Sequence, residues 1–149
     1  MYVVVDANKI NTNNIFFQER INNTVIENSK FIRIIYSNEL FTLNGIFLNF
    51  SLQLLGIEKS FNKYKCIFDT NVNNETISTV SNIEKTILQK INIKDKIPVY
   101  KIYENLHFGF IKSFNNSVCN EDKNQFVIKI YGIWENNYEY GLTYKFINV

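Results

Sequence analysis

The most regular alternation of apolar and polar residues lies at the end of the chain, in residues 125–149. Successive side chains of a strand point to opposite faces of a sheet, so this pattern predicts strands with one buried face and one face toward water or a partner. Residues 135–137 supply a polar turn, and Gly141 accepts a positive φ or a bulge. We therefore expect a closing β-hairpin. Its predicted buried positions are Phe126, Ile128, Ile130, Leu142, Tyr144 and Phe146, with Trp134 in the same register.

Further strands are predicted where β-branched and aromatic residues cluster. These segments are residues 31–36, 63–69, 99–104 and 108–114. Leu106 and His107 would form the turn between the last two, and residues 115–124 form a polar loop. Residues 2–5 fit either a short strand or an arm, and residues 10–20 give no clear pattern.

Residues 40–55 are long for a single strand and contain Asn44 and Gly45, which both accept a positive φ. Either residues 41–43 and 47–52 form a tight hairpin, or Gly45 is a bulge in one bent strand. The Asn-Gly pair favours the hairpin.

One helix is predicted in residues 74–91, where apolar residues recur at three- and four-residue spacing. Asn74 is suited to cap its N-terminus, and Glu75 lies near the positive end of the helix. A chain of 149 residues with one Pro and five Gly fits a single domain, residues 1–149. The expected fold is a β-rich α+β domain, mainly β, in which an antiparallel small barrel or sandwich carries one helix inserted between strands.

Composition narrows the class of protein. The first residues have neither a basic start nor a long apolar run, and no segment approaches the roughly 20 apolar residues of a membrane span. We therefore expect a soluble intracellular protein without a membrane partner. Cys66 and Cys119 have no metal-binding spacing, so we expect reduced thiols, with Cys66 buried.

Sequence motifs for enzymes and cofactors are absent, including those of phosphate-binding loops, dinucleotide-binding folds and hydrolases. His107 is the only histidine and has no Ser or Cys partner nearby in the sequence. Asp6, Asp69 and Asp95 have no spacing that would gather them around a metal. We predict a non-enzymatic protein without a cofactor or metal, and the weaker alternative is an enzyme that uses Asp6, Asp69 or His107.

Lysines recur beside aromatic residues on the polar side of the predicted strands. Ammonium groups pair with phosphates, and aromatic rings stack on bases of any sequence, so this combination is typical of single-stranded nucleic-acid binding. The net charge of +2 is small, so such a site must be a local patch. The alternative is a solvated face, because a chain rich in Lys and Tyr shows such pairs without any function. The candidate site residues are Lys63, Lys65, Lys101, Tyr103, Lys129, Tyr131 and Lys145.

Two stretches of the closing hairpin carry a resemblance: Gly132 with Ile133 and Trp134, and residues 140–143. They resemble uncharacterised proteins of nucleocytoplasmic large DNA viruses and, more distantly, the terminal hairpin of phage-type single-stranded DNA-binding proteins. Residues 31–37 and 41–45 add to the viral resemblance. The phage proteins have an OB fold with a helix between the third and fourth strands, so the resemblance implies an OB-like barrel here. The phage proteins end in an acidic tail, whereas residues 145–149 here contain a lysine and no acidic residue, so we do not expect tail-mediated regulation or recruitment from the resemblance.

Together these observations predict a viral single-stranded nucleic-acid-binding protein, most simply a DNA-binding one, that works in the infected host cell. The alternative is a structural or interaction protein such as a minor virion component. That alternative would be packaged in the virion and would bind other viral proteins or a second copy of the chain. The aromatic content of 15% and the absent catalytic motifs favour this second class as well.

Overall fold

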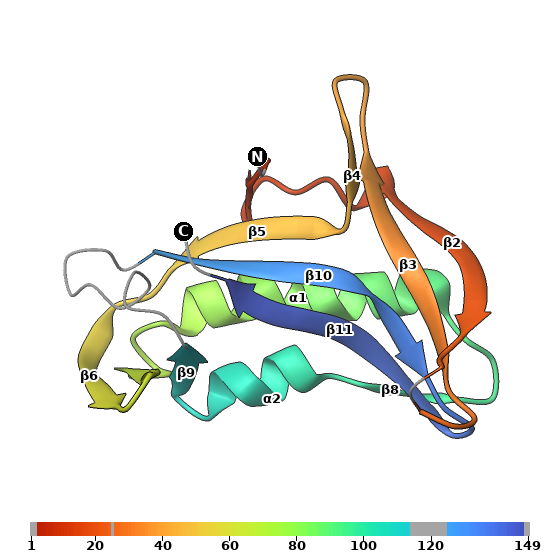
Figure 1. The fold of residues 1–149 in the computed structure, drawn as a ribbon. Coiled ribbons are helices and arrows are strands. Elements are labelled where there is room, and N and C mark those ends of the chain that lie inside the picture. Colours follow the sequence, from red (N-terminus) through yellow and green to blue (C-terminus); the bar gives the residue numbers. More distant parts are fainter. Residues whose placement is uncertain (1–2, 25, 114–124, 148–149) are drawn as a thin grey trace.

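A computed structural model describes residues 3–24, 26–113 and 125–147 (Figure 1). Most of the ordered elements are strands, which confirms the β-rich class. Eight strands form the larger of two sheets and three form the smaller. The larger sheet contains β1 (Val5–Asp6), β2 (Ile15–Asn22), β3 (Lys30–Ser37), β4 (Thr42–Asn44), β5 (Ile46–Ser51), β8 (Ile97–Val99), β10 (Gln125–Glu135) and β11 (Glu139–Ile147).

The long strand β10 is the centre of the larger sheet. Along one edge its residues 125–130 pair with β5 and its residues 132–135 pair with β3, while β11 lies along the other edge. The strand β3 also carries β2 and β4. Two pairings, β1 with β5 and β8 with β11, are parallel, so the sheet is mixed rather than purely antiparallel. The described strands form no closed barrel, and the OB-like barrel implied by the resemblance is not supported.

The closing hairpin is confirmed as β10 and β11. Asn136 forms its turn by accepting hydrogen bonds from the backbone N–H groups of Tyr138 and Glu139 at 2.8 and 2.7 Å. The predicted register holds only as far as Ile130, because a β-bulge follows that residue. The prediction for Gly141 was wrong, since no bulge or positive φ occurs there.

Tyr131 is the extra residue of the bulge, because it has no pairing partner on β11. Ile130 pairs with Tyr144, and the next pair along is Gly132 with Thr143. Ile130 and Ile133 are both buried although they are three residues apart, so the alternation of faces shifts by one between them. Trp134 is therefore not in the core register that the sequence predicted.

The smaller sheet has the order β6-β7-β9 and is built from β6 (Leu54–Ser60), β7 (Lys63–Phe68) and β9 (Phe110–Ser113). The strands at residues 63–69 and 108–114 are thus confirmed in their centres. Cys66 is buried as expected, but it is disulfide-bonded rather than reduced. The prediction of a reduced thiol failed because distance along the sequence does not limit which thiols meet in space. Cys119 lies outside the described residues, as does the predicted loop 115–124.

The helix α1 (Asn74–Ile91) confirms the predicted helix and lies behind the larger sheet in Figure 1. Its apolar stripe is buried in the same core cluster as the inner residues of β3, β5 and β10. The cap position is Asn73 rather than Asn74, and Asn73 makes no side-chain cap bond. Its side chain instead accepts a hydrogen bond from the N–H of Gln53 at 2.7 Å and donates to the oxygen of Gln53 at 3.0 Å, tying the start of α1 to the chain before β6.

A second helix, α2 (Lys101–His107), replaces the strand predicted at residues 99–104 and the turn predicted at Leu106 and His107. Ile102 and Leu106 are its buried residues, four positions apart on one side of the helix. Over so few residues, alternation and helical spacing look alike, which is why the strand was predicted. The actual turn follows at Gly109, whose φ is +81°.

Gly45 bends the chain between β4 and β5 and has a φ of +98°. The hairpin favoured at this point was wrong: β4 pairs with β3, whereas β5 pairs with β1 and β10. The bent-strand alternative is closer to the structure. A short 3-10 helix, η1 (Thr12–Asn14), precedes β2, and the sequence patterns did not predict either β2 or β6. No helix in the described ranges is long and apolar enough to cross a membrane.

Candidate nucleic-acid interface

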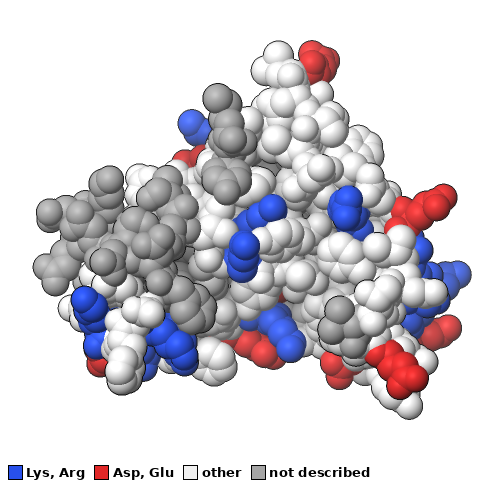
Figure 2. Space-filling view, in the orientation of Figure 1, with Lys and Arg blue, Asp and Glu red and all other residues white. Residues whose placement is uncertain are grey.

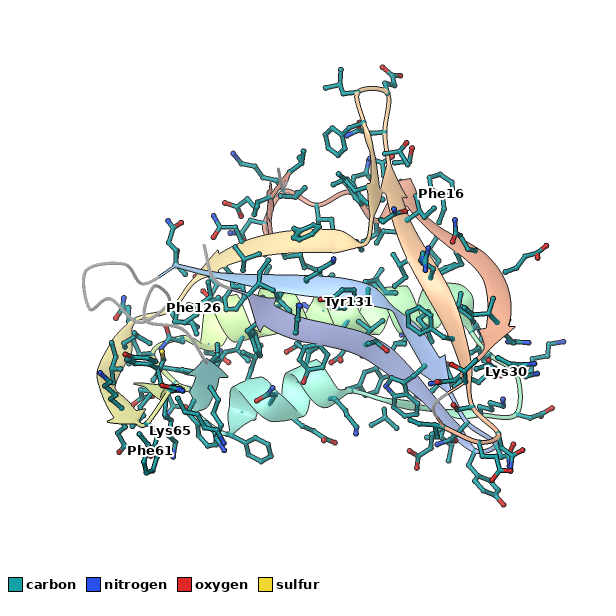
Figure 3. The ribbon with its side chains drawn as sticks, viewed as in Figure 1. Phe16, Lys30, Phe61, Lys65, Phe126 and Tyr131 are labelled. Carbon is teal, nitrogen blue, oxygen red and sulfur yellow. The ribbon has the colours of Figure 1, made fainter. Side chains whose placement is uncertain are left out.

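The larger sheet turns one face away from α1, and the side chain of Tyr131 lies in the middle of that face (Figure 3). Lys129 and Tyr131 come from β10, Lys145 comes from β11, and Trp134 follows on β10 after the bulge. Lys101, at the start of α2, reaches the same group of side chains. We call these five residues the basic-aromatic face: Lys101, Lys129, Tyr131, Trp134 and Lys145.

Tyr131 is flanked by two ammonium groups. The Nζ atom of Lys129 lies 4.3 Å from the centroid of the Tyr131 ring, and that of Lys145 lies 5.4 Å from it. The negative face of an aromatic ring attracts a cation at such distances. Lys129 and Lys145 are also direct partners across the two strands. Like charges directly opposite each other are unfavourable in a sheet, so an anion bound between them would be attracted by both.

Trp134 is held flat against the sheet by a glycine. A side chain on Gly141 would begin within 3.0 Å of the indole ring, so the ring lies on the bare backbone of its cross-strand partner. The Nζ atom of Lys101 lies 5.7 Å from the centroid of the Trp134 ring. Trp134 is half-buried, which leaves part of its ring accessible next to a cation.

The β-bulge explains why these rings share a face. Without the extra residue, Trp134 would alternate with Tyr131 and point into the core. The isolated Gly132 within a strand pattern was the available signal, because glycine inside a strand often marks a bulge. Trp134 is the residue of this face that the sequence patterns missed.

The predicted residues Lys63 and Lys65 lie elsewhere, on β7 of the smaller sheet. The Nζ atoms of Lys65 and of its cross-strand partner Lys112 lie 4.3 and 5.7 Å from the ring centroid of Phe110. This arrangement repeats the pairing of two lysines around one ring. It forms a second basic cluster, which sequence reasoning found only in part, since Lys112 and Phe110 were not among the predicted site residues.

Tyr103 does not join either cluster. It lies on α2, with its ring centroid 4.0 Å from that of His107, and both border a pocket of about 480 Å³ between α1 and α2. The Nδ1 atom of His107 lies 2.8 Å from the backbone oxygen of Tyr103, which holds the imidazole along the helix. Of the seven predicted residues, Lys129, Tyr131 and Lys145 therefore come together, and Lys101 reaches the same face beside Trp134.

The charge distribution agrees with this division. Figure 2 shows Lys and Arg side chains in the middle of the molecule, over β10 and β11, and a separate group at the lower left beside the smaller sheet. Within the described residues, no group of three or more His, Cys, Asp or Glu side chains could hold a metal ion. Comparison with known proteins adds no family to this geometry, because no family model, curated protein or solved structure matches the chain.

Proposed function

We propose that the protein binds single-stranded nucleic acid, DNA in the first instance, on the basic-aromatic face. The observation that carries the proposal is the Tyr131 ring between the ammonium groups of Lys129 and Lys145. The proposal requires neither an OB barrel nor a viral source. It rests on the chemistry of one exposed surface.

Each part of a nucleotide has a counterpart on this face. Phosphates would pair with the ammonium groups, and bases would stack on Tyr131 and on the accessible part of Trp134, a mode that tolerates any base sequence. Lysine stems are flexible, so an ammonium group can leave the ring for a phosphate while a base takes its place. A single strand offers such unpaired bases, whereas a duplex hides them.

Fluorescence anisotropy with a labelled single-stranded oligonucleotide at low salt tests the proposal. The variant Lys129→Glu with Tyr131→Ala should weaken binding by at least about tenfold, because one stacked base alone contributes about 1–3 kcal/mol. The matched control is Lys85→Glu with Tyr138→Ala, which makes the same chemical changes on exposed residues of α1 and of the hairpin turn. Absent binding, or an equal loss in both variants, would overturn the proposal.

A second candidate function is that of an interaction protein. Large apolar side chains are exposed around the smaller sheet: Leu55 is 72% exposed, Phe108 is 68% exposed, and Phe61, between β6 and β7, is 95% exposed. Exposed apolar groups of this size favour contact with another protein. Sedimentation of the wild type over a range of concentrations, beside Phe61→Ser with Phe108→Ser, tests whether that contact is with a second copy. Self-association that the variant abolishes supports this function, and a wild-type monomer throughout excludes a second copy.

A further inference from the structure

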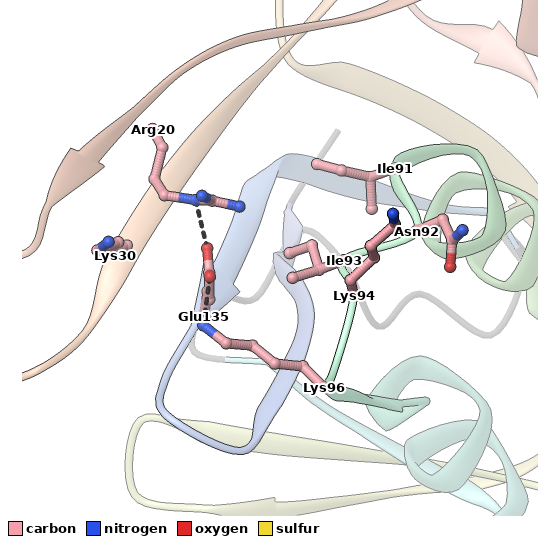
Figure 4. Close-up of a pocket in the computed structure, with 8 residues that line it drawn as sticks. All are labelled: Arg20, Lys30, Ile91, Asn92, Ile93, Lys94, Lys96 and Glu135. Atoms are coloured by element: carbon pink, nitrogen blue, oxygen red, sulfur yellow. Dashed lines mark hydrogen bonds and ion pairs between the residues drawn. The ribbon is translucent and has the colours of Figure 1, made fainter.

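A hollow of about 450 Å³ lies at the C-terminal end of β10, where β2, β3, β10 and the segment that leaves α1 meet (Figure 4). Arg20 comes from β2, Lys30 begins β3, and Glu135 ends β10. The segment that leaves α1 closes the opposite side. From this segment the residues that line the hollow are Ile91, Asn92, Ile93, Lys94 and Lys96. None of the seven residues predicted from the sequence lines this hollow.

A buried carboxylate organises two of the cations. Glu135 is 3% exposed, and its Oε2 atom pairs with the Nε atom of Arg20 at 2.7 Å. Its Oε1 atom pairs with the Nζ atom of Lys96. A buried carboxylate requires such partners, and in return it holds both cations in place at the wall. In Figure 4 the rest of the Arg20 guanidinium group points away from Glu135, to the side on which Ile91 is drawn.

Lys30 and Lys94 add positive charge that this carboxylate does not balance. Both are exposed. Lys30 is the cross-strand partner of Glu135, but neither lysine forms an ion pair with an acidic residue among the described residues. Four cationic side chains and one carboxylate line the hollow, so it carries an excess of three positive charges. The entire chain has a net charge of only +2. The C-terminal end of α1 borders the hollow and opposes an anion with about half a charge, which the lysines outweigh.

From this arrangement we propose that the hollow binds a small organic phosphate or polyphosphate. Guanidinium and ammonium groups are the usual partners of phosphate oxygens, and the terminal nitrogens of Arg20 suit a forked contact. The volume suits a ligand of nucleotide size rather than a single phosphate ion, since small-molecule sites span about 300–1,000 Å³. Ile91 and Ile93 supply an apolar wall for the organic part. This site and its ligand class are separate from the nucleic-acid proposal.

Isothermal titration calorimetry at physiological salt and without divalent cations tests this site, with ATP, pyrophosphate, citrate and adenosine as probes. ATP and pyrophosphate should each bind once and saturably, citrate should bind at least about tenfold more weakly, and adenosine should not bind. Each of the changes Lys30→Gln and Lys94→Gln should weaken ATP binding by about tenfold, and the variant that carries both should show the two losses combined. Both residues are exposed, so unfolding of the free protein should not change.

Two controls make the result specific. Lys9→Gln with Lys85→Gln removes two exposed lysines outside the hollow and should leave ATP affinity unchanged. Lys129→Glu with Tyr131→Ala should also leave it unchanged, even if that variant loses oligonucleotide binding. The proposal is overturned if ATP does not bind saturably, if citrate binds as well as pyrophosphate, or if the control lysines matter as much as Lys30 and Lys94.

Discussion

At the scale of single residues, two glycines allow aromatic rings to lie directly on the backbone of the central hairpin. The ring of Phe31 lies against Gly132, and that of Trp134 lies against Gly141. Both contacts are between neighbouring strands, where an aromatic ring can cover the gap left by a missing side chain. These glycines are therefore needed for close approach rather than for an unusual φ.

A substitution at Gly132 should be costly for this reason. A Cβ atom there would lie within 3.0 Å of the carbonyl oxygen of Ile32 and of the Phe31 ring. We expect Gly132→Ala to lower the free energy of unfolding by about 2–3 kcal/mol, as overpacking does in a well-packed core. Urea denaturation measures the change.

Gly56, on β6, is the matched control, because a Cβ atom added there meets nothing within 4 Å. Gly56→Ala should leave stability unchanged or raise it by up to about 1 kcal/mol, since alanine restricts the unfolded chain. Similar losses in the two variants would contradict the packing of Phe31 on Gly132.

At the scale of elements, α2 depends on a side chain from α1. Glu84 is fully buried, and its two carboxylate oxygens accept hydrogen bonds from the N–H groups of Ile102 and Tyr103 at 2.9 and 3.0 Å. These are N–H groups of the first turn, which have no partner within their own helix. The first turn of α2 is also tied to β11, because the hydroxyl of Tyr144 donates to the oxygen of Lys101 at 3.2 Å.

Glu84 should make stability depend on pH. Burial raises the pKa of its carboxyl above the usual 4.5, the two N–H groups oppose this, and nearby Glu104 adds to the rise. Above pH 4.5 the folded chain therefore holds this proton more tightly than the unfolded chain does. The stability that the group contributes is complete below that pH and is lost as pH rises through the raised pKa.

The variant Glu84→Gln removes this ionisation. We expect the stability of Glu84→Gln relative to wild type to increase as pH rises from 4.5 toward neutral. The glutamine amide has only one accepting oxygen for the two N–H groups, which lowers the stability of the variant at every pH without changing this trend. Urea denaturation across that range measures the difference. Glu75→Gln, at an exposed position in the first turn of α1, is the matched control for the exchange of glutamate for glutamine. A constant difference between Glu84→Gln and wild type would contradict the raised pKa.

The helix α2 also shows what the sequence could predict and what it could not. The helix α1 was predicted, apart from its cap at Asn73, because its apolar stripe runs through 18 residues. The seven residues of α2 carry too few repeats to distinguish a helix from a strand, and Glu84, which satisfies its first turn, lies 17 positions before it in the chain. A helix stabilised from outside has no local signal.

The candidate site was predictable to a similar extent. Alternation along each strand placed Lys129 and Tyr131 on one face, and pairing of the hairpin brought Lys145 to them. The position of Trp134 depended on a one-residue bulge, which reverses every later side chain. Lys101 was assigned to a strand and reaches the face from a helix instead. The hollow around Glu135 gave no sequence signal, because its lining comes from residues 20–30, 91–96 and 135.

At the scale of the whole molecule, the net charge is small although the cationic side chains gather in three groups. The basic-aromatic face contains three lysines, the smaller sheet has Lys65 and Lys112 around Phe110, and the hollow at the end of β10 contains four cationic side chains. The net charge of +2 arises because acidic residues elsewhere offset these groups. Local attraction for anions can therefore be strong while long-range attraction stays weak.

This distribution predicts a shallow dependence of oligonucleotide binding on salt. If a single strand contacts only Lys101, Lys129 and Lys145, the slope of log K against log salt concentration should be about −2, at roughly −0.7 for each phosphate contact. The variant Lys65→Gln with Lys112→Gln should leave that slope unchanged. Anisotropy titrations at several salt concentrations measure both slopes. A wild-type slope near −4 that becomes shallower in this variant would mean that the strand continues onto the smaller sheet, and would contradict a site confined to the basic-aromatic face.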